Sequence, residues 1–358
     1  MPSLKEIKGR INSISSTLAI TSAMKMVASA KLQKAQMAIQ NMLPYERRLY
    51  SMLVDLMGAM NISAAASEDG SVRGSGSAER GFDQSGDRLS LSNRHDLAGM
   101  DGAYSLMAQR EVRKVAIVAF ASNSSLCGAF NSNAIREATA VINEYRASGL
   151  RDSDIVVYSV GRKMAEAMRK LGFPSPADFT KMSDSPSYEA ASALAQELLD
   201  GFVSGRFDKV ELVYNHYKST SSQLTTRQTY LPLSLADATA GIQVGKITDS
   251  ASESDTNRGA EPVGAPVVRQ GSPTTEDLIV EPSKEALIAT LLPKVVRLRI
   301  FTTLLDSAAA EHAARTVAMQ LATDNGNDLL QELTLEYNKG RQQKITSEIL
   351  DLVGGSMQ

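Results

Sequence analysis

The sequence predicts an α/β protein in which the N- and C-terminal helices form a long antiparallel two-helix coiled coil. The middle of the chain is predicted to form a Rossmann-like α/β domain. Two observations predict this architecture. Apolar and small residues recur at spacings of three and four along both ends of the chain, as in a coiled coil. Between the ends, patterns of strand length alternate with patterns of helix length, as in a domain with a mainly parallel sheet.

The expected parts follow one another with boundaries set by changes in composition. They are an N-terminal coiled-coil helix over 1–60, an insertion over 61–110, the α/β domain over 111–235, a connecting loop with a low-complexity insertion over 236–280, and a C-terminal coiled-coil helix over 281–358. Two segments, 64–94 and 249–275, contain few large apolar residues, so they bury too little surface to offset the entropy of ordering. We expect both to be mobile surface insertions, and a regulatory role for either remains an alternative.

The first helix is expected to run from Ser3 to about Met57. Ser3 followed by Glu6 is a capping-box signature that fixes the first turn. Pro44 is expected to kink the helix, because proline removes a backbone donor and crowds the preceding turn. At ~1.5 Å per residue, the helix is roughly 80 Å long. Its seam consists of Leu4, Ile7, Ile11, Ile14, Leu18, Thr21, Ala28, Leu32, Ala35, Ile39 and Met42.

The last helix is expected to run from Ser283 to about Leu352 and to stop at Gly354-Gly355. Helices of this length can bury their seams only against each other or a partner, so we expect antiparallel pairing. The seam consists of Leu298, Phe301, Leu305, Ala308, His312, Arg315, Met319, Ala322, Gly326, Leu329 and Leu333. Its small residues predict a slim rod. The polar residues Lys25, His312 and Arg315 leave two hypotheses open: they fix the register, or they face a partner.

The central domain is expected to alternate strands and helices. Strands are predicted over 112–121, 155–160 and 209–217, with a further edge strand over 225–233, and helices are predicted through 135–145 and over 162–171 and 187–202. This alternation is typical of a small domain with a mainly parallel sheet.

The global charge argues against a protein dedicated to nucleic acid. Lys plus Arg number 38 and Asp plus Glu number 40, for a formal net charge of -2, whereas such proteins are basic overall. The charge is uneven, however, because residues 1–48 contain only Glu6 and Glu46 against a stripe of basic residues. A solvated face, an acidic protein partner and nucleic acid remain open, although no interleaved aromatic residues support base stacking. The stripe comprises Lys5, Lys8, Arg10, Lys25, Lys31, Lys34, Arg47 and Arg48.

The compartment is expected to be the bacterial cytoplasm. Cys127 is the only cysteine, which excludes an internal disulfide and fits a reducing environment. No run of ~18 or more apolar residues is present, and the first residues lack the apolar core of a signal peptide and the pattern of a transit peptide. We therefore expect the chain to reach a membrane only through partners.

Sequence motifs for catalysis are largely missing. The chain has no G-x-x-x-x-G-K-[ST] and no G-x-G-x-x-G after its first strand, so we expect no nucleotide or other cofactor. The loop from Ser122 to Gly128 does follow that strand, where doubly wound folds bind ligands. Cys127 within it is either a nucleophile or, as we favour, a structural residue, because a nucleophile needs a positioned base. The scattered His95, His216 and His312 form no metal-ligand spacing.

Motifs at both ends of the chain carry a resemblance to a known family. The N-terminal motifs are Ile11-Asn12-Ser13-Ile14 and Thr21-Ser22-Ala23-Met24-Lys25-Met26-Val27-Ala28. The C-terminal motifs include Glu311-His312-Ala313-Ala314-Arg315, Ala322-Thr323-Asp324-Asn325, Tyr337-Asn338-Lys339 and Ile345-Thr346-Ser347-Glu348-Ile349, and the central ones are Leu126-Cys127-Gly128 and Val213-Tyr214-Asn215. In this order they resemble the gamma subunits of bacterial F-type ATP synthases, end to end except for the two insertions. Asn123-Ser124-Ser125 departs from the family pattern of an Asp, a basic residue and a Gly before Leu-Cys-Gly.

The resemblance implies a central rotary shaft without a catalytic site. It would couple proton-driven rotation of a c-ring to ATP synthesis in a hexamer of alpha and beta subunits, together with an epsilon subunit, as a peripheral protein on the cytoplasmic face of the bacterial inner membrane. The residues matched to hexamer contacts are Met24, Lys25, Lys31, Arg315, Arg341, Gln342, Thr346 and Glu348, and those matched loosely to the c-ring foot are Leu278 and Glu281. The 64–94 insertion matches in position a regulatory element of photosynthetic gamma subunits. Without a second cysteine it cannot be a dithiol switch, and a brake on reverse rotation is the remaining hypothesis.

Two rival functions remain open. One is an enzyme that binds a small ligand at the Ser122 loop and uses the long helices as an oligomerisation arm. The other is a structural coiled-coil scaffold that forms a homodimer.

Overall fold

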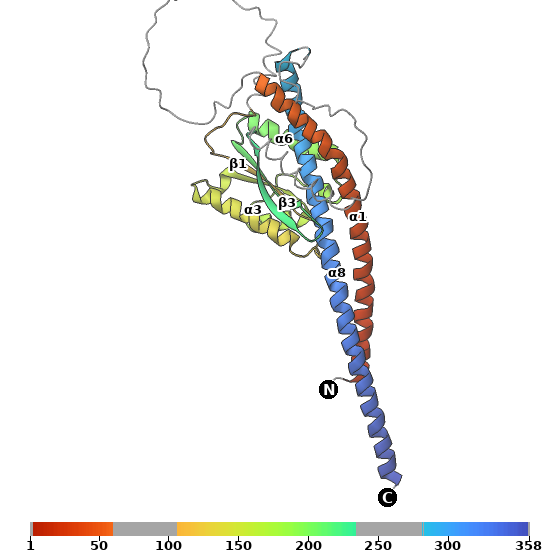
Figure 1. Ribbon diagram of the computed structural model, residues 1–358. Helices are drawn as coiled ribbons and strands as arrows, with labels where there is room; N and C mark the ends of the chain where they lie inside the picture. Colours follow the sequence, from red (N-terminus) through yellow and green to blue (C-terminus); the bar gives the residue numbers. More distant parts are fainter. Residues whose placement is uncertain (1–2, 60–105, 234–280, 282, 357–358) are drawn as a thin grey trace, which may run out of the picture.

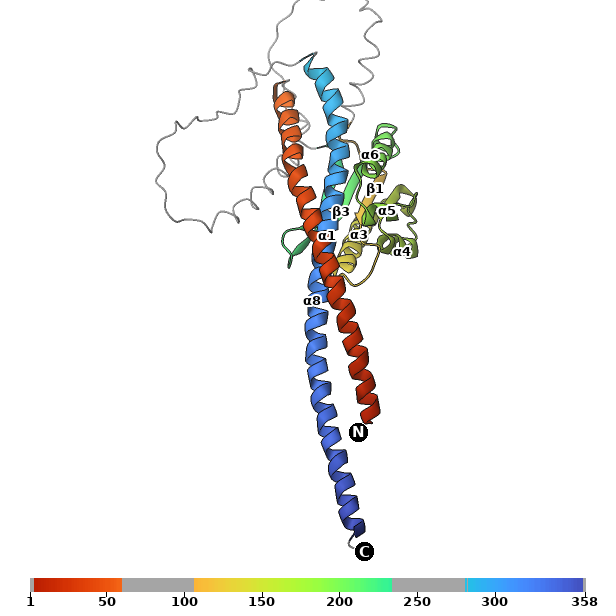
Figure 2. The ribbon, with the colours of Figure 1, turned by 90° about the vertical axis from the view of Figure 1, so that its right-hand side faces the viewer.

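Two very long helices dominate the architecture. The computed structural model describes residues 3–59, 106–233, 281 and 283–356. Within them, α1 (Leu4–Ala59) and α8 (Lys284–Ser356) run antiparallel and side by side, and an α/β domain lies beside one end of the pair (Figures 1 and 2). The predicted fold class, a two-helix coiled coil with a Rossmann-like domain, is confirmed.

The start of α1 agrees with its predicted capping box, whereas the end of α8 differs from the predicted stop. At the start of α1, the Ser3 hydroxyl accepts a hydrogen bond from the Glu6 N–H at 3.3 Å, as the capping box predicts. The helix continues through Pro44 as one element. The stop predicted at Gly354-Gly355 is wrong, because α8 includes both glycines and ends at Ser356. Glycine ends a helix when its backbone turns left-handed, and here both residues keep helical geometry.

Small residues let the two helices approach closely. A Cβ atom built on Gly326 would lie 2.6 Å from Leu18 Cδ2, and one on Gly340 would lie 3.2 Å from Leu4 Cδ2. One turn closer to the domain than Gly326, the Thr21 and Thr323 hydroxyls lie 3.1 Å apart. Nearer the domain, the seam is closed by a buried cluster of Leu32, Ala35, Ala309 and Ala313. The slim rod expected from the small seam residues is present.

The central domain is built on a four-stranded sheet. Its strands are β1 (Val115–Phe120), β2 (Ile155–Val160), β3 (Lys209–Tyr217) and β4 (Gln223–Leu231), in the order β2-β1-β3-β4. The first three are mutually parallel, and β4 pairs antiparallel with β3 as the expected edge strand. The helices are α3 (Phe130–Ala147), α4 (Arg162–Lys170), α5 (Thr180–Asp184) and α6 (Tyr188–Val203), with a 3-10 turn at Asp152–Asp154.

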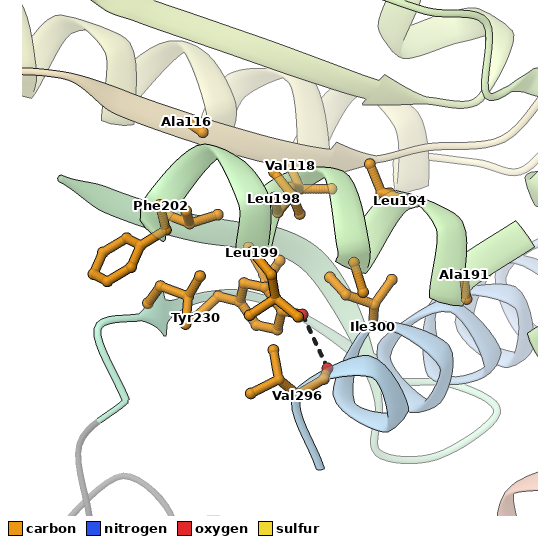
Figure 3. Packing of buried hydrophobic residues seen from close by; sticks show 14 of the residues in the cluster. Ala116, Val118, Ala191, Leu194, Leu198, Leu199, Phe202, Tyr230, Val296 and Ile300 are labelled. Carbon is orange, nitrogen blue, oxygen red and sulfur yellow. Dashed lines mark hydrogen bonds between the residues drawn. The ribbon is translucent and has the colours of Figure 1, made fainter. Parts of the chain in front are cut away.

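The long helix α8 also covers the sheet. Alternate residues of β1 point to opposite faces, so that Ile117 packs among α3 and α4 whereas Val118 packs among α6 and α8. Figure 3 shows the second face, where Leu198 of α6 lies beside Val118 of β1 and Leu199 of α6 lies on the side of Val296 and Ile300 of α8. The Tyr230 hydroxyl donates to the Val296 carbonyl at 2.9 Å. The α8 residues in this core recur every four positions: Ile288, Leu292, Val296, Ile300 and Leu304.

The two predicted insertions, 64–94 and 249–275, lie outside the described residues, so their predicted mobility stays a prediction. No helix of the described part combines the length and apolar character that crossing a membrane requires.

Gly161 is expected to be the glycine of the domain that tolerates substitution least. It joins β2 to α4 with φ +101°, and an added Cβ would lie 2.0 Å from the carbonyl oxygen of Ala121. Gly149 has a similar φ of +96° but nothing within 4 Å. Gly149→Ala should therefore lower the free energy of unfolding only by the backbone strain, about 1–3 kcal/mol. Gly161→Ala should lower it clearly more, because its Cβ would also clash with the Ala121 carbonyl. Urea denaturation of both variants measures the difference, and equal costs would contradict the close approach.

Candidate interaction surfaces and the junction between rod and domain

The tip of α8 extends beyond its partner helix. Gly340 faces Leu4 at the start of α1, so among the described residues no second helix lies against 341–356 (Figures 1 and 2). Every residue from 341 to 350 is exposed. Ile345, Ile349 and Leu352 are 48 to 75 % exposed and recur at spacings of four and three, which places them on one face of the helix. An apolar stripe on a single exposed helix is typical of a surface that a partner covers.

Four of the predicted contact residues lie on this tip. Arg341, Gln342, Thr346 and Glu348 are all exposed. The Thr346 hydroxyl donates to the Gln342 carbonyl at 2.9 Å, and Glu348 lies 3.7 Å from Lys344 in an exposed ion pair. The pair is worth little in solvent, so these side chains can reorient toward a partner at small cost.

The predicted contacts on α1 lie where the rod leaves the domain, with Lys31 close to Glu311 and His312 of α8. Met24 and Lys31 are exposed, and Lys25 is half-buried. Other large apolar side chains of the rod are also exposed on both helices, among them Leu329, which was predicted to lie in the seam and is 46 % exposed. They are Ile20, Met26, Val27 and Met37 on α1 and Leu321, Leu329 and Leu335 on α8.

Arg315 contacts its own chain. Its Nη1 donates to the Ser125 carbonyl at 2.7 Å, and its Nη2 donates to the Ser124 hydroxyl at 2.9 Å and to Glu311 Oε1 at 2.7 Å. Only 13 % of the side chain is exposed. The predicted contact residue thus ties α8 to the loop after β1. At the opposite end of the rod Glu281 is exposed, whereas Leu278 lies outside the described residues.

The loop after β1 is covered by α8. Cys127 is buried and packs with Phe130 against Ala310 and Ala314 of α8. Its Sγ contacts Asn131 Nδ2 at 3.1 Å and the Ser122 hydroxyl at 3.7 Å, and neither group is a base. The loop lies where the chain switches from one side of β1 to the other, the position at which doubly wound folds bind ligands. Here the long helix occupies it, which disfavours the rival ligand site.

A buried charge pair joins the two long helices beside the domain. Glu46 of α1 lies 3.8 Å from Arg299 of α8 and accepts a hydrogen bond from the Thr302 hydroxyl at 3.2 Å. Arg299 also donates to the Tyr50 hydroxyl at 3.3 Å. Burial raises the pKa of Glu46 even though Arg299 opposes the rise. Removing either partner would leave an uncompensated buried charge, so the pair fixes how the helices face each other.

A second polar junction joins the end of β3 to both helices. His216 Nδ1 lies 2.6 Å from Asp306 Oδ2, and the Tyr217 N–H donates to Asp306 Oδ1 at 2.9 Å. Gln36 of α1 donates to the Tyr217 hydroxyl at 2.6 Å. The hydrogen bond to Asp306 raises the pKa of His216 above its usual 6.5. Asp306 was not predicted to have a role, although a carboxylate within the apolar run around Leu304 and Leu305 was a signal in the sequence.

His312 lies in the seam without a partner for one nitrogen. Its Nδ1 is buried and makes no hydrogen bond with the described residues. Burial, together with the positive charges of Lys31 and Arg315, lowers the pKa of His312 to about 4. The side chain is therefore neutral near pH 7.

Comparisons with known proteins agree over the whole chain. A sequence model of a family described as ATP synthase matches residues 3–357. The ATP synthase gamma chain of Phocaeicola vulgatus is 47% identical over 357 residues, and that of Bacteroides thetaiotaomicron is 45% identical over 358, with 100% of each chain covered. That of Flavobacterium johnsoniae is 35% identical over 356 residues, covering 99% of this chain and 98% of the other. A chain of the Euglena gracilis mitochondrial ATP synthase has a TM-score of 0.52 at 18% identity, covering 99% of this chain and 93% of that one, and shows a shared fold.

The His216–Asp306 junction is expected to make stability depend on pH. A histidine whose folded pKa is raised contributes fully below its unfolded pKa of about 6.5, and the contribution is lost as pH rises through the folded value. At pH 6 the free energy of unfolding of the unchanged protein should therefore exceed that of the His216→Gln variant. The difference between the two should become smaller toward pH 8.5. Urea denaturation of both proteins across this range measures the gap. A gap that stays constant would show that protonation of His216 does not support the junction.

Proposed function

The chain belongs to the family of ATP synthase gamma chains. We propose that its coiled coil is the central rotary shaft of an F-type ATP synthase. A proton-driven c-ring turns the rod, and the turning rod drives the catalytic sites of an alpha/beta hexamer through their states in sequence. One observation carries this proposal. The α/β domain holds one end of the rod, whereas the far part exposes apolar and charged side chains along both helices and on a single-helix tip.

The rod presents different chemistry in different directions. α1 contributes exposed Lys31 beside exposed Met24, α8 contributes Leu321 and Leu335, and only α8 reaches the tip. A rod without rotational symmetry, placed among three equivalent sites, contacts each of them differently at any moment. One turn then exposes every site to each face of the rod in order. Met24, Lys25, Lys31, Arg341, Gln342, Thr346 and Glu348 are the residues that we propose for these contacts.

The chain itself supplies no catalytic site in this proposal. The edge of the sheet where a doubly wound domain would bind a ligand is filled by α8, and Cys127 is enclosed there beside Ser122 and Asn131. Among the described residues, no group of His, Cys, Asp and Glu side chains could hold a metal ion. ATP chemistry then belongs to the alpha and beta subunits, and the gamma chain needs no cofactor.

The other end of the rod is the proposed attachment point. The α/β domain and the adjoining parts of α1 and α8 would bind the epsilon subunit and the c-ring, with Glu281 and Leu278 near the ring. The chain would lie on the cytoplasmic face of the bacterial inner membrane, held there by these partners.

Reconstitution with the matching alpha and beta subunits tests the proposal. We expect one copy of the chain to join each hexamer and to produce ATPase activity that neither part has alone. Ile345→Ser combined with Ile349→Ser should lower that activity about tenfold, equivalent to ~1.4 kcal/mol, because it removes the apolar stripe of the tip. Both side chains are exposed, so the isolated chain should keep its stability within about 0.5 kcal/mol.

The matched control is Leu171→Ser, which removes a similarly exposed apolar side chain at the end of α4. It should leave the ATPase activity unchanged. If no complex forms while all subunits are folded, the shaft proposal is wrong and the ligand-binding interpretation of the α/β domain becomes the leading one.

A further inference from the structure

The rod leaves the α/β domain between Leu304 and Ala318 of α8. Up to Leu304, α8 is part of the core on the sheet. Beyond that residue the domain contacts α8 first through Asp306, then through Cys127 and Phe130 packed on Ala310 and Ala314, and last through Arg315 and the approach of Gly128 to Ala318. The free part of α8 after Ala318 is roughly 60 Å long at ~1.5 Å per residue. A force perpendicular to the rod at the end of α8 therefore produces a large torque at the contacts of Arg315 and Ala318 with the domain.

Arg315 holds a loop that is itself rigid. Within the domain, the Asn123 side chain donates to the Thr180 carbonyl at 2.7 Å and accepts from the Arg162 N–H at 2.8 Å. Asn131 Oδ1 accepts from the Ser122 N–H at 3.0 Å. The loop backbone is thus fixed on one side by the sheet and its helices. Arg315 fixes it on the other side by two hydrogen bonds to Ser124 and Ser125.

The charges at this contact depend on the loop being in place. Arg315 and Glu311 are only 13 and 11 % exposed, and burial raises the pKa of Glu311 despite the opposing hydrogen bond from Arg315. Lys31 of α1 and Asp184 of α5 are the other charged groups that act on Glu311, and Lys31 also acts on His312. A buried guanidinium needs several acceptors, and the loop supplies two of them. If the domain separated from the rod here, Arg315 would lose both hydrogen bonds to the loop, and the Arg315–Glu311 pair would lose its cover.

We propose that Arg315 is a positioning residue that latches the α/β domain to the rod at the point where the rod leaves the domain, rather than a contact to the catalytic subunits. The core over Ile288 to Leu304 already joins α8 to the sheet, and the latch makes the part of the rod beyond Leu304 turn with the domain, so in that respect the inference rests on the proposed shaft function. Its two acceptors, Ser124 and Ser125, belong to the segment that departs from the family pattern. The departure supplies the neutral Ser124 hydroxyl where the family pattern has a basic side chain, whereas the Ser125 acceptor is a backbone carbonyl that any residue there would provide.

The test combines removal of the latch with its replacement by a covalent bond. Arg315→Gln with Glu311→Gln removes the latch without leaving a buried charge. The replacement is a disulfide from Gly128→Cys and Ala318→Cys in a Cys127→Ala background, because the Cβ positions lie 3.9 Å apart, within the range for a disulfide. The disulfide pair without the Arg315 change measures any strain at Gly128, whose φ is +58°. Lys163→Gln with Glu166→Gln, an ion pair on α4, is the matched control.

The first measurement uses the isolated full chain and does not depend on the proposed function. Amide hydrogen exchange of residues 122–131 should be at least about tenfold faster in the Arg315/Glu311 variant than in wild type, and the oxidised disulfide should restore it. The control pair should leave it unchanged. Exchange as slow as in wild type would overturn the latch.

The second measurement uses the complete enzyme in membrane vesicles. In the Arg315/Glu311 variant, the ratio of ATP-driven proton pumping to ATP hydrolysis should fall by at least half, and oxidation of the disulfide should restore it. If exchange protection returns with the disulfide but the ratio does not, Arg315 acts on a partner and the proposal is overturned. Failure of wild-type chain to support any hydrolysis would instead count against the shaft function, and the exchange result would stand.

Discussion

The helix α8 has to bury two surfaces at once, and the remaining structure depends on that constraint. Its residues from Ile288 to Leu304 complete the core on one face of the sheet, while Ala309 and Ala313 close the seam with α1. Neither α1 nor the sheet can bury its apolar side chains without it. The coiled coil and the α/β domain therefore form one folding unit, although their sequence patterns differ, and over Ile288 to Leu304 the domain cannot move on the rod without exposing its own core.

Polar contacts then decide how the parts face each other. Apolar seams made of alanine and leucine tolerate sliding, because neighbouring turns look alike. The Glu46–Arg299 pair and the Asp306 junction do not tolerate it, since a shift by one turn would leave buried charges without partners. Their net contribution to stability is modest. Their larger effect is to exclude every register but one, and a lever needs a single register if each angle of rotation is to present one defined surface.

The local patterns predicted most of the fold. The bounds of β2 and β3 were predicted to the residue, and those of the long helices within a few residues, because short apolar runs and heptad patterns depend on neighbours in sequence. The five-residue α5 was missed because so short a helix leaves little periodicity. Contacts between elements could not be predicted in the same way. Arg315 was expected to face a partner or the other helix, and its burial depends on the loop at Ser124 arriving beside α8, which no local pattern encodes.

The pairing of the two chain ends also constrains how the protein is made. During synthesis α1 is complete at Ala59, but its seam partner begins only at Lys284 and ends at Ser356. At ~5–20 residues per second, the nascent chain carries α1 unpaired for roughly 10 to 60 s. Throughout that time its narrow apolar seam faces the cytosol or a chaperone. Ile20, Met26 and Val27 are exposed outside the seam as well, so the waiting helix depends on its lysine and arginine side chains, or on a chaperone, to stay in solution until the ribosome releases the last turn.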